Sequence, residues 1–230
     1  IDTTNAPAID LDAITTNVTL ASVHAVNAGD VGINLSNLST GSRFQVLGDT
    51  SIDGATTSIN IDGIGSGSAI TFDQVDIIDR IGSAIAINDA DGLINFGDIT
   101  VTNPNNVGGN TITYTNSLAD VTVANVDIGG SLGNSLHLEN SAGSFTVNGG
   151  SITSGTAGIY ACNIGELVAK NISFNLVDSG ITLLQDTSST MTATVSGNTL
   201  GLGGFAATSI NGSTLRLDLS SNTANTFSLT

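Results

Sequence analysis

Three aspartates and an arginine lie close together in the sequence and are the first residues to consider for chemistry. Asp73, Asp76, Asp79 and Arg80 would supply the clustered carboxylates of a polysaccharide hydrolase, or the base and calcium-binding carboxylates of a polysaccharide lyase. Their spacing predicts Asp73 at a corner, Asp76 on the outer side of a strand, and Asp79 with Arg80 in the loop that follows. Because these positions diverge, we expect a solvated face and no catalytic residue.

The remaining reactive side chains are few and separated. His24 and His137 lie several repeats apart in the pattern described below, too far to share a metal ion or a nucleophile. His137 and Glu139 alternate onto the outer side of one predicted strand, where exposed polar residues are ordinary. The single cysteine, Cys162, cannot form an internal disulfide, and its position predicts an inert residue that faces outward or lines a corner.

No cofactor is predicted, with calcium as the alternative. Calcium prefers oxygen ligands, and six aspartates lie toward the N-terminal half of the chain. The Gly-Gly-x-Gly-x-Asp repeat of calcium-binding β-solenoids does not occur in the sequence. The aspartates are Asp10, Asp12, Asp30, Asp49, Asp53 and Asp62.

The composition excludes several classes of partner. The chain has 4 Lys and Arg against 20 Asp and Glu, and its net charge of -16 would repel nucleic acid and anionic lipid surfaces. No stretch approaches the ~20 apolar residues of a membrane span, so we do not expect a membrane-embedded protein. Hydrophobic residues make up 40% of the chain while aromatics make up 4%, which predicts a core of Ile, Val, Leu and Ala.

A repeat that runs through nearly the whole chain must position these residues. Apolar-x-apolar triplets recur in pairs around a short polar corner, as in Val121–Val123 followed by Val126–Ile128. Alternation turns the first and third residues of each triplet inward. A third strand precedes each pair and recurs about every two dozen residues, which predicts an all-β solenoid of about nine coils with three short strands per coil. The predicted starts of this third strand are Ile9, Ile33, Ile59, Ile85, Ile112, Leu136, Ile159, Ile181 and Ile210.

Amide and carboxylate side chains recur just after the third strand begins. Stacked amides can hydrogen-bond to one another along a solenoid axis, so we predict an internal structural ladder at this position. At the two-residue corners, Asn171 and Asp98 are expected to tolerate a left-handed backbone better than other non-glycine residues. The predicted ladder consists of Asn37, Asp89, Asn116, Asn140, Asn163 and Gln185.

A second predicted ladder lies on the outside. The middle residues of the second strand form one outward column that is rich in threonine, and it resembles the ice-contact face of ice-binding β-solenoids. Threonine is also an ordinary residue of exposed strands, and other residue types interrupt the column. The column contains Thr19, Thr71, Thr122, Thr146 and Thr192, with Gln45, Asn95 and Val168 between them.

The strand sequences carry a family resemblance. Gly-Ile-x-Leu-type strands such as Val31–Leu35 and Ser179–Leu183, with the amide ladder and the two-residue corners, resemble right-handed parallel β-helix repeats of pectate-lyase-like topology. In this form, poor in Lys and rich in Thr, Asn and Gly, the chain is similar to passenger or stalk regions of bacterial autotransporter and adhesin proteins. The resemblance implies a right-handed β-helix and a secreted or cell-surface protein exposed at the bacterial outer membrane.

Together these observations predict one β-helix domain over residues 1–230, expected to be a fragment of a longer surface protein. We expect a non-enzymatic structural or adhesive segment that acts as a rigid stalk or adhesin passenger. Its expected partners are a host surface, a glycan or a neighbouring protein chain. The alternatives are a polysaccharide lyase or hydrolase, and an ice-binding solenoid that uses the threonine column.

Overall fold

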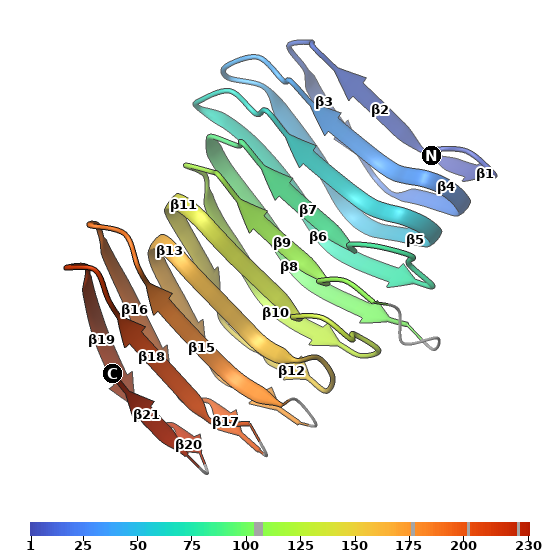
Figure 1. The fold of residues 1–230 in the computed structure, drawn as a ribbon. Helices are drawn as coiled ribbons and strands as arrows, with labels where there is room; N and C mark the ends of the chain where they lie inside the picture. The colour runs from blue at the N-terminus through green and yellow to red at the C-terminus, as the bar shows by residue number, and fades with distance from the viewer. Residues whose placement is uncertain (104–107, 176–177, 202, 225) are drawn as a thin grey trace.

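The chain folds into a parallel β-solenoid of about nine coils, as the repeat predicts. The computed structural model describes residues 1–103, 108–175, 178–201, 203–224 and 226–230, and within these ranges it contains strands and no helix. Figure 1 shows the coils following one another in a single stack, from the N-terminal strands in blue to the C-terminal strands in red. The predicted fold class is confirmed, and the hand of the coil stays a prediction.

The strands differ in length because several of them pass through a corner without a break in their pairing. Strand β5, for example, contributes to two successive coils. The strands are β1 (Asp2–Thr4), β2 (Ile9–Asp12), β3 (Asn17–Leu20), β4 (Val23–Ser36), β5 (Arg43–Asp62), β6 (Ser68–Ile78), β7 (Ile85–Asn88), β8 (Gly92–Thr102), β9 (Ile112–Thr115), β10 (Asp120–Ile128), β11 (Leu136–Val147), β12 (Gly150–Ile152), β13 (Ala157–Lys170), β14 (Ile172–Phe174), β15 (Ser179–Gln185), β16 (Thr190–Ser196), β17 (Thr199–Leu200), β18 (Phe205–Ser209), β19 (Thr214–Ser220), β20 (Thr223–Ala224) and β21 (Phe227–Leu229).

Successive coils lie in parallel register. The predicted starts from Ile9 to Ile181 form one continuous column, in which each residue pairs with its equivalent in the next coil. The second strand forms a similar column, in which Val121 pairs with Ile94 on one side and with Phe145 on the other. The periodicity in the sequence is therefore the rise from one coil to the next.

One predicted start was wrong. Ile210 lies between strands and is 45% exposed, whereas the residue that pairs with Ile181 is Phe205. Phe227 continues the column by one more pair. Ile210 precedes a turn in which Asn211 has positive φ. The prediction was wrong because this apolar loop residue happens to lie at about the repeat spacing from Ile181.

The core is a thin column of aliphatic side chains, with the few aromatic residues stacked between them. Phe72 and Phe96 occupy equivalent positions in successive coils, with ring centroids 5.5 Å apart. Phe44 pairs with Ile70 in the preceding step, and its ring lies 5.7 Å from that of Phe72. Tyr114 and Phe145 form a second pair at 5.5 Å. All five rings are buried, so the inward triplet positions predicted from alternation are confirmed in these coils.

The corners use left-handed residues at one recurrent position. Most residues of the predicted amide ladder, from Asn37 to Asn163, have φ between 47° and 53°. At the other corner Asn171 has φ 54°, while Asp98 does not have positive φ. A left-handed Asn costs less than most other side chains, because its short polar group can bond locally.

Candidate functional site

The acidic group that first suggested catalysis does not converge. Asp73 is exposed at a corner, and Asp76 lies in a strand between Ser51 and Thr100 of the neighbouring coils. Arg80 is buried and donates to the backbone oxygen of Gly82 and, over 2.8 Å, to Thr111 Oγ1. Burial also lowers the pKa of Arg80.

Arg80 therefore supports the interior of the solenoid. The sequence predicts Arg80 in a loop on a solvated face, and its burial corrects that expectation. Asp79, beside it, is partly exposed. The diverging positions predicted for Asp73 and Asp76 are confirmed.

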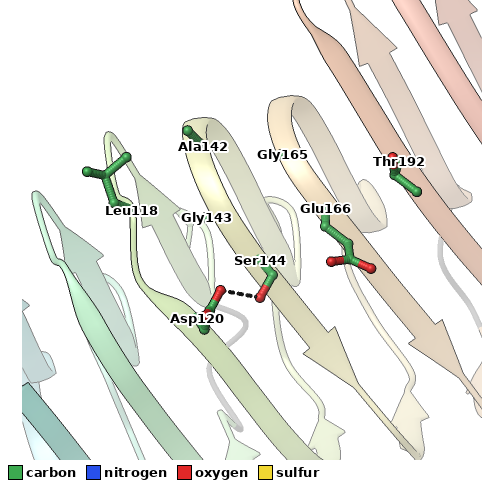
Figure 2. A pocket seen from close by; sticks show the side chains of 8 residues that line it. All are labelled: Leu118, Asp120, Ala142, Gly143, Ser144, Gly165, Glu166 and Thr192. Atoms are coloured by element: carbon green, nitrogen blue, oxygen red, sulfur yellow. Dashed lines mark hydrogen bonds between the residues drawn. The ribbon is translucent and has the colours of Figure 1, made fainter. Parts of the chain in front are cut away.

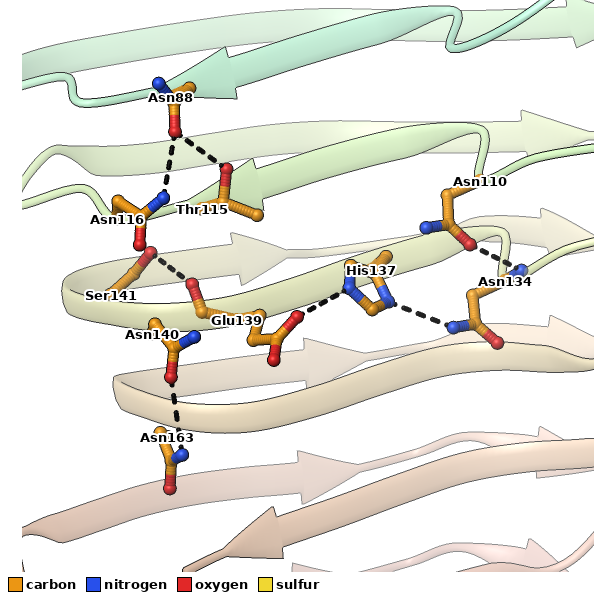
Figure 3. Close-up of polar contacts among 10 residues, drawn as sticks. All are labelled: Asn88, Asn110, Thr115, Asn116, Asn134, His137, Glu139, Asn140, Ser141 and Asn163. Atoms are coloured by element: carbon orange, nitrogen blue, oxygen red, sulfur yellow. Dashed lines mark hydrogen bonds and ion pairs between the residues drawn. The ribbon is translucent and has the colours of Figure 1, made fainter. Parts of the chain in front are cut away.

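His137 and its neighbours form a hydrogen-bonded group of titratable side chains on the outer face (Figure 3). Its Nδ1 accepts from Asn134 Nδ2 and its Nε2 donates to Glu139 Oε2, each over 3.0 Å. The imidazole also stacks on Tyr160 of the next coil, with ring centroids 5.2 Å apart. The outward position predicted for His137 and Glu139 is confirmed.

The stacking of His137 on Tyr160 connects two successive coils. The imidazole and phenol rings each present a face to the other, so those faces are unavailable to a sugar ring.

Desolvation by burial raises the pKa of Tyr160 to about 12 and also raises the pKa of the Cys162 thiol. Cys162 belongs to the outward column beside Glu139, as predicted, but its side chain is covered. A protonated, covered thiol is a poor nucleophile.

Polar ladders run along the outer face of the strand that begins at Ile9, Ile33 and Ile59. Asn60 Nδ2 donates to Asn34 Oδ1, and Asn34 Nδ2 donates to Asp10 Oδ1, both over 2.8 Å. In the neighbouring column Asn88 Nδ2 donates to Asp62 Oδ1 over 2.7 Å. Figure 3 shows the continuation, in which Thr115 and Asn116 both donate to Asn88.

The predicted internal amide ladder is largely on the outside. Asn37, Asp89, Asn116 and Asn140 are exposed, and one rung between predicted members is present, in which Asn163 donates to Asn140 over 3.4 Å (Figure 3). The prediction of an internal position was wrong for these residues, because the left-handed corner turns the side chain outward.

Gln185, the last predicted member, is buried. Its Nε2 donates to Thr187 Oγ1 over 3.1 Å and to Ser189 Oγ over 2.7 Å, both within its own corner. It therefore closes a loop and does not extend the ladder of the preceding coils.

The buried ladders lie at positions that the sequence patterns did not single out. Ile172 N donates to Asn198 Oδ1 over 2.9 Å, and Asn198 N donates to Asn222 Oδ1 over 3.0 Å. A serine version lies at another corner, where the backbone N–H of Ser42 donates to Ser68 Oγ over 3.1 Å. A small polar residue that recurs one coil later was the available signal, but serine and asparagine are too frequent in this chain for it to stand out.

The threonine column is formed in part. Thr19, Thr71, Thr122 and Thr146 share one register column with Gln45, Asn95 and Val168, as predicted. Thr192 does not belong to it, because Thr192 pairs with Glu166 and the column continues through Thr194. The long corner before β16 shifted the alignment by two residues.

The six N-terminal aspartates are spread over several coils. Asp10 and Asp12 engage Asn34, Ser36 and Asn37 of the next coil, and the bonds from Asn37 and Ser36 lower the pKa of Asp12. Among the residues that the structure describes, no three His, Cys, Asp or Glu side chains come together as a metal-binding group.

A shallow hollow on the side of the stack gathers carboxylates from different coils (Figure 2). Asp120 and Glu166 project into it from β10 and β13, with Ser144 between them in the register. Ser144 Oγ donates to Asp120 Oδ1 over 2.7 Å. Leu118, 61% exposed, lines the hollow beside Asp120.

The length of the corners creates this hollow. Strands β11 and β13 continue through the corner without a loop, so their coils protrude less at this side of the stack than coils that have a loop there. Loops separate β15 from β16 toward the C-terminus, and β4, β5 and β6 from one another toward the N-terminus. A second hollow, which contains Arg43 and Leu93, shares Leu118 and Asp120 with the first, so the two are continuous.

No protein-family model matches this chain, and neither a curated protein nor a solved structure matches it. In the parts of the chain that the structure describes, no helix has the length and apolar character to cross a membrane.

Proposed function

We propose that this chain is a non-enzymatic structural or adhesive segment that acts as a rigid rod. The observation that carries the proposal is the continuous parallel pairing of coil on coil, from β1 to β21. Each coil is held to the next by backbone hydrogen bonds, apolar columns and outward polar ladders such as that of Asp10, Asn34 and Asn60. A rod built this way resists bending and presents long, regular polar faces.

The proposed setting is a secreted or cell-surface bacterial protein of the autotransporter or adhesin kind, with a right-handed β-helix. Support comes from the strand resemblance and from the acidic composition, which keeps an exposed protein soluble. The proposed partner is a host surface, a glycan or a neighbouring protein chain. The outward polar faces offer carboxylates, amides and hydroxyls that suit hydrogen bonding to such partners.

Immobilisation on beads tests this proposal. Beads that carry the chain should be retained on a host-cell layer or a glycan surface, and the chain should release no product from acidic and neutral polysaccharides. New reducing ends or unsaturated products would contradict the non-enzymatic role. Asp120 and Glu166 would then be the first residues to replace, because their coils are two steps of ~4.8 Å apart, near the separation found in inverting hydrolases.

One observation favours ice binding as a second candidate. Thr122 and Thr146 are adjacent in the outward column, and Thr19 and Thr71 lie in the same line. An ice recrystallisation assay tests it: inhibition that is lost in Thr122→Val/Thr146→Val would support ice binding. Absence of inhibition at high protein concentration would dismiss it.

A further inference from the structure

We propose that the hollow beside Asp120 binds an extended, cationic polypeptide segment of a partner protein. This inference goes beyond the rod proposed above, which would stand even if the hollow bound nothing. It rests on the shape of the hollow, on its exposed leucines and on the sign of its charge.

The hollow is long and has an open floor. From Arg43 to Thr192 its register column crosses six coil steps, or ~29 Å at ~4.8 Å per step. At Gly143 and Gly165 a Cβ would lie 2.2 Å from a backbone oxygen of the preceding coil. Both glycines line the hollow and carry no side chain, so a ligand can approach the backbone between these closely packed coils. An extended segment of about nine residues would span this length.

The walls combine apolar contact with negative charge. Leu118 is 61% exposed and Leu93 is 45% exposed, which gives aliphatic side chains a surface to cover. Asp91, Asp120 and Glu166 come from three different coils, and Arg43 at the N-terminal end is the cation that lines these hollows. Carboxylates beside aliphatic surface suit Lys and Arg, whose stems are apolar and whose heads are charged.

Charge complementarity selects this occupant over the others. The net charge of -16 repels acidic polysaccharides, nucleic acid and anionic lipid, and it accelerates the encounter with a basic segment. A neutral glycan would normally stack on an aromatic platform, whereas the apolar residues that line these hollows are leucines and alanines.

Fluorescence anisotropy with a labelled peptide of about ten residues, in which Lys alternates with Val, tests the proposal. We expect saturable binding that weakens with salt, and no binding of the matched peptide with Glu in place of Lys. Asp120→Asn/Glu166→Gln should weaken binding about tenfold, and Leu118→Ser should weaken it several-fold. Circular dichroism confirms that each variant is folded, since all three residues lie on the surface.

A matched control separates local binding from general attraction. Asp73→Asn/Asp218→Asn also removes two negative charges, but from exposed positions outside the hollow. This pair should change the affinity less than about twofold. Equal weakening by both pairs, or no binding of the Lys peptide, would overturn the proposal. So would binding of a neutral hexasaccharide that Leu118→Ser abolishes while the Lys peptide does not compete.

Discussion

The side-chain amide of Asn198 donates to the side-chain oxygen of Asn222, one coil further along, across 3.0 Å. Asn198 also accepts from the backbone N–H of Ile172 and donates to the backbone oxygen of Ala169, both over 2.9 Å. Asn198 is buried, so one side chain satisfies backbone groups that water does not reach. The ladder therefore ties the C-terminal coils together.

Replacing Asn198 should be costly. Asn198→Ala leaves a buried N–H and a buried carbonyl without a side-chain partner, and we expect the free energy of unfolding to fall by about 2–3 kcal/mol. Urea denaturation followed by circular dichroism measures this change. Asn125→Ala is the control: it removes an exposed bond to Asp98 and should cost less than about 1 kcal/mol. Equal costs for the two variants would contradict the buried ladder.

Gly97 tests how closely the coils approach at a corner. A Cβ there would lie 2.0 Å from the backbone oxygen of Asp73, so Gly97→Ala must push two coils apart. We expect a loss of about 1–3 kcal/mol in the free energy of unfolding. Gly108→Ala, where a Cβ meets no atom within 4 Å, should change the stability little. A thermal melt that ranks the two variants in the opposite order would contradict the corner geometry.

Burial of Tyr114 predicts a loss of stability at alkaline pH. Desolvation, with the nearby charge of Asp120, raises the pKa of Tyr114 above its ordinary value of 10.0. The unfolded chain therefore releases this proton at a lower pH than the folded chain does. The stabilising contribution is complete below pH 10 and is lost as the pH rises from there toward the folded-state pKa.

Tyr114→Phe checks that prediction. The variant loses the bond to Ala119 O at neutral pH, but its free energy of unfolding should fall less steeply above pH 10 than that of the parent chain. Tyr160 on the outer face, with a pKa of about 12, gives the comparison, because the part of the slope that Tyr160→Phe removes should end near pH 12, before the part that Tyr114→Phe removes. Unchanged slopes in Tyr114→Phe, measured in urea across this pH range, would show that Tyr114 is not responsible.

The sequence predicted those parts of the fold that repeat at fixed positions. Inward residues such as Val121 and Ile94 recur with the coil period, and alternation alone places them in the core. The prediction failed where the corner length changes. Ile210 lies within a corner and Thr192 follows a long one, and there equal spacing along the chain no longer means equal position in the coil.

The surface features depended on information that the repeat does not hold. The hollow around Asp120 and Leu118 exists because coils with short corners lie between coils with longer, protruding corners. Such a difference becomes visible only when the coils are compared in space. The side of the chain on which Asn116 and Asn140 lie depended on a left-handed backbone at the corner, where alternation no longer applies. Their side chains face outward even though their spacing is regular.

One sequence repeat of this solenoid equals one coil step. Spin labels at Thr19 paired with Thr122, Thr146 or Thr194, in a Cys162→Ser background, test it by double electron–electron resonance. The residues lie four, five and seven steps apart in one column, so the mean distances should rise along a line of ~4.8 Å per step, near 19, 24 and 34 Å. Distances that do not increase in this order, or that do not fit one common rise per coil, would contradict the stacked solenoid.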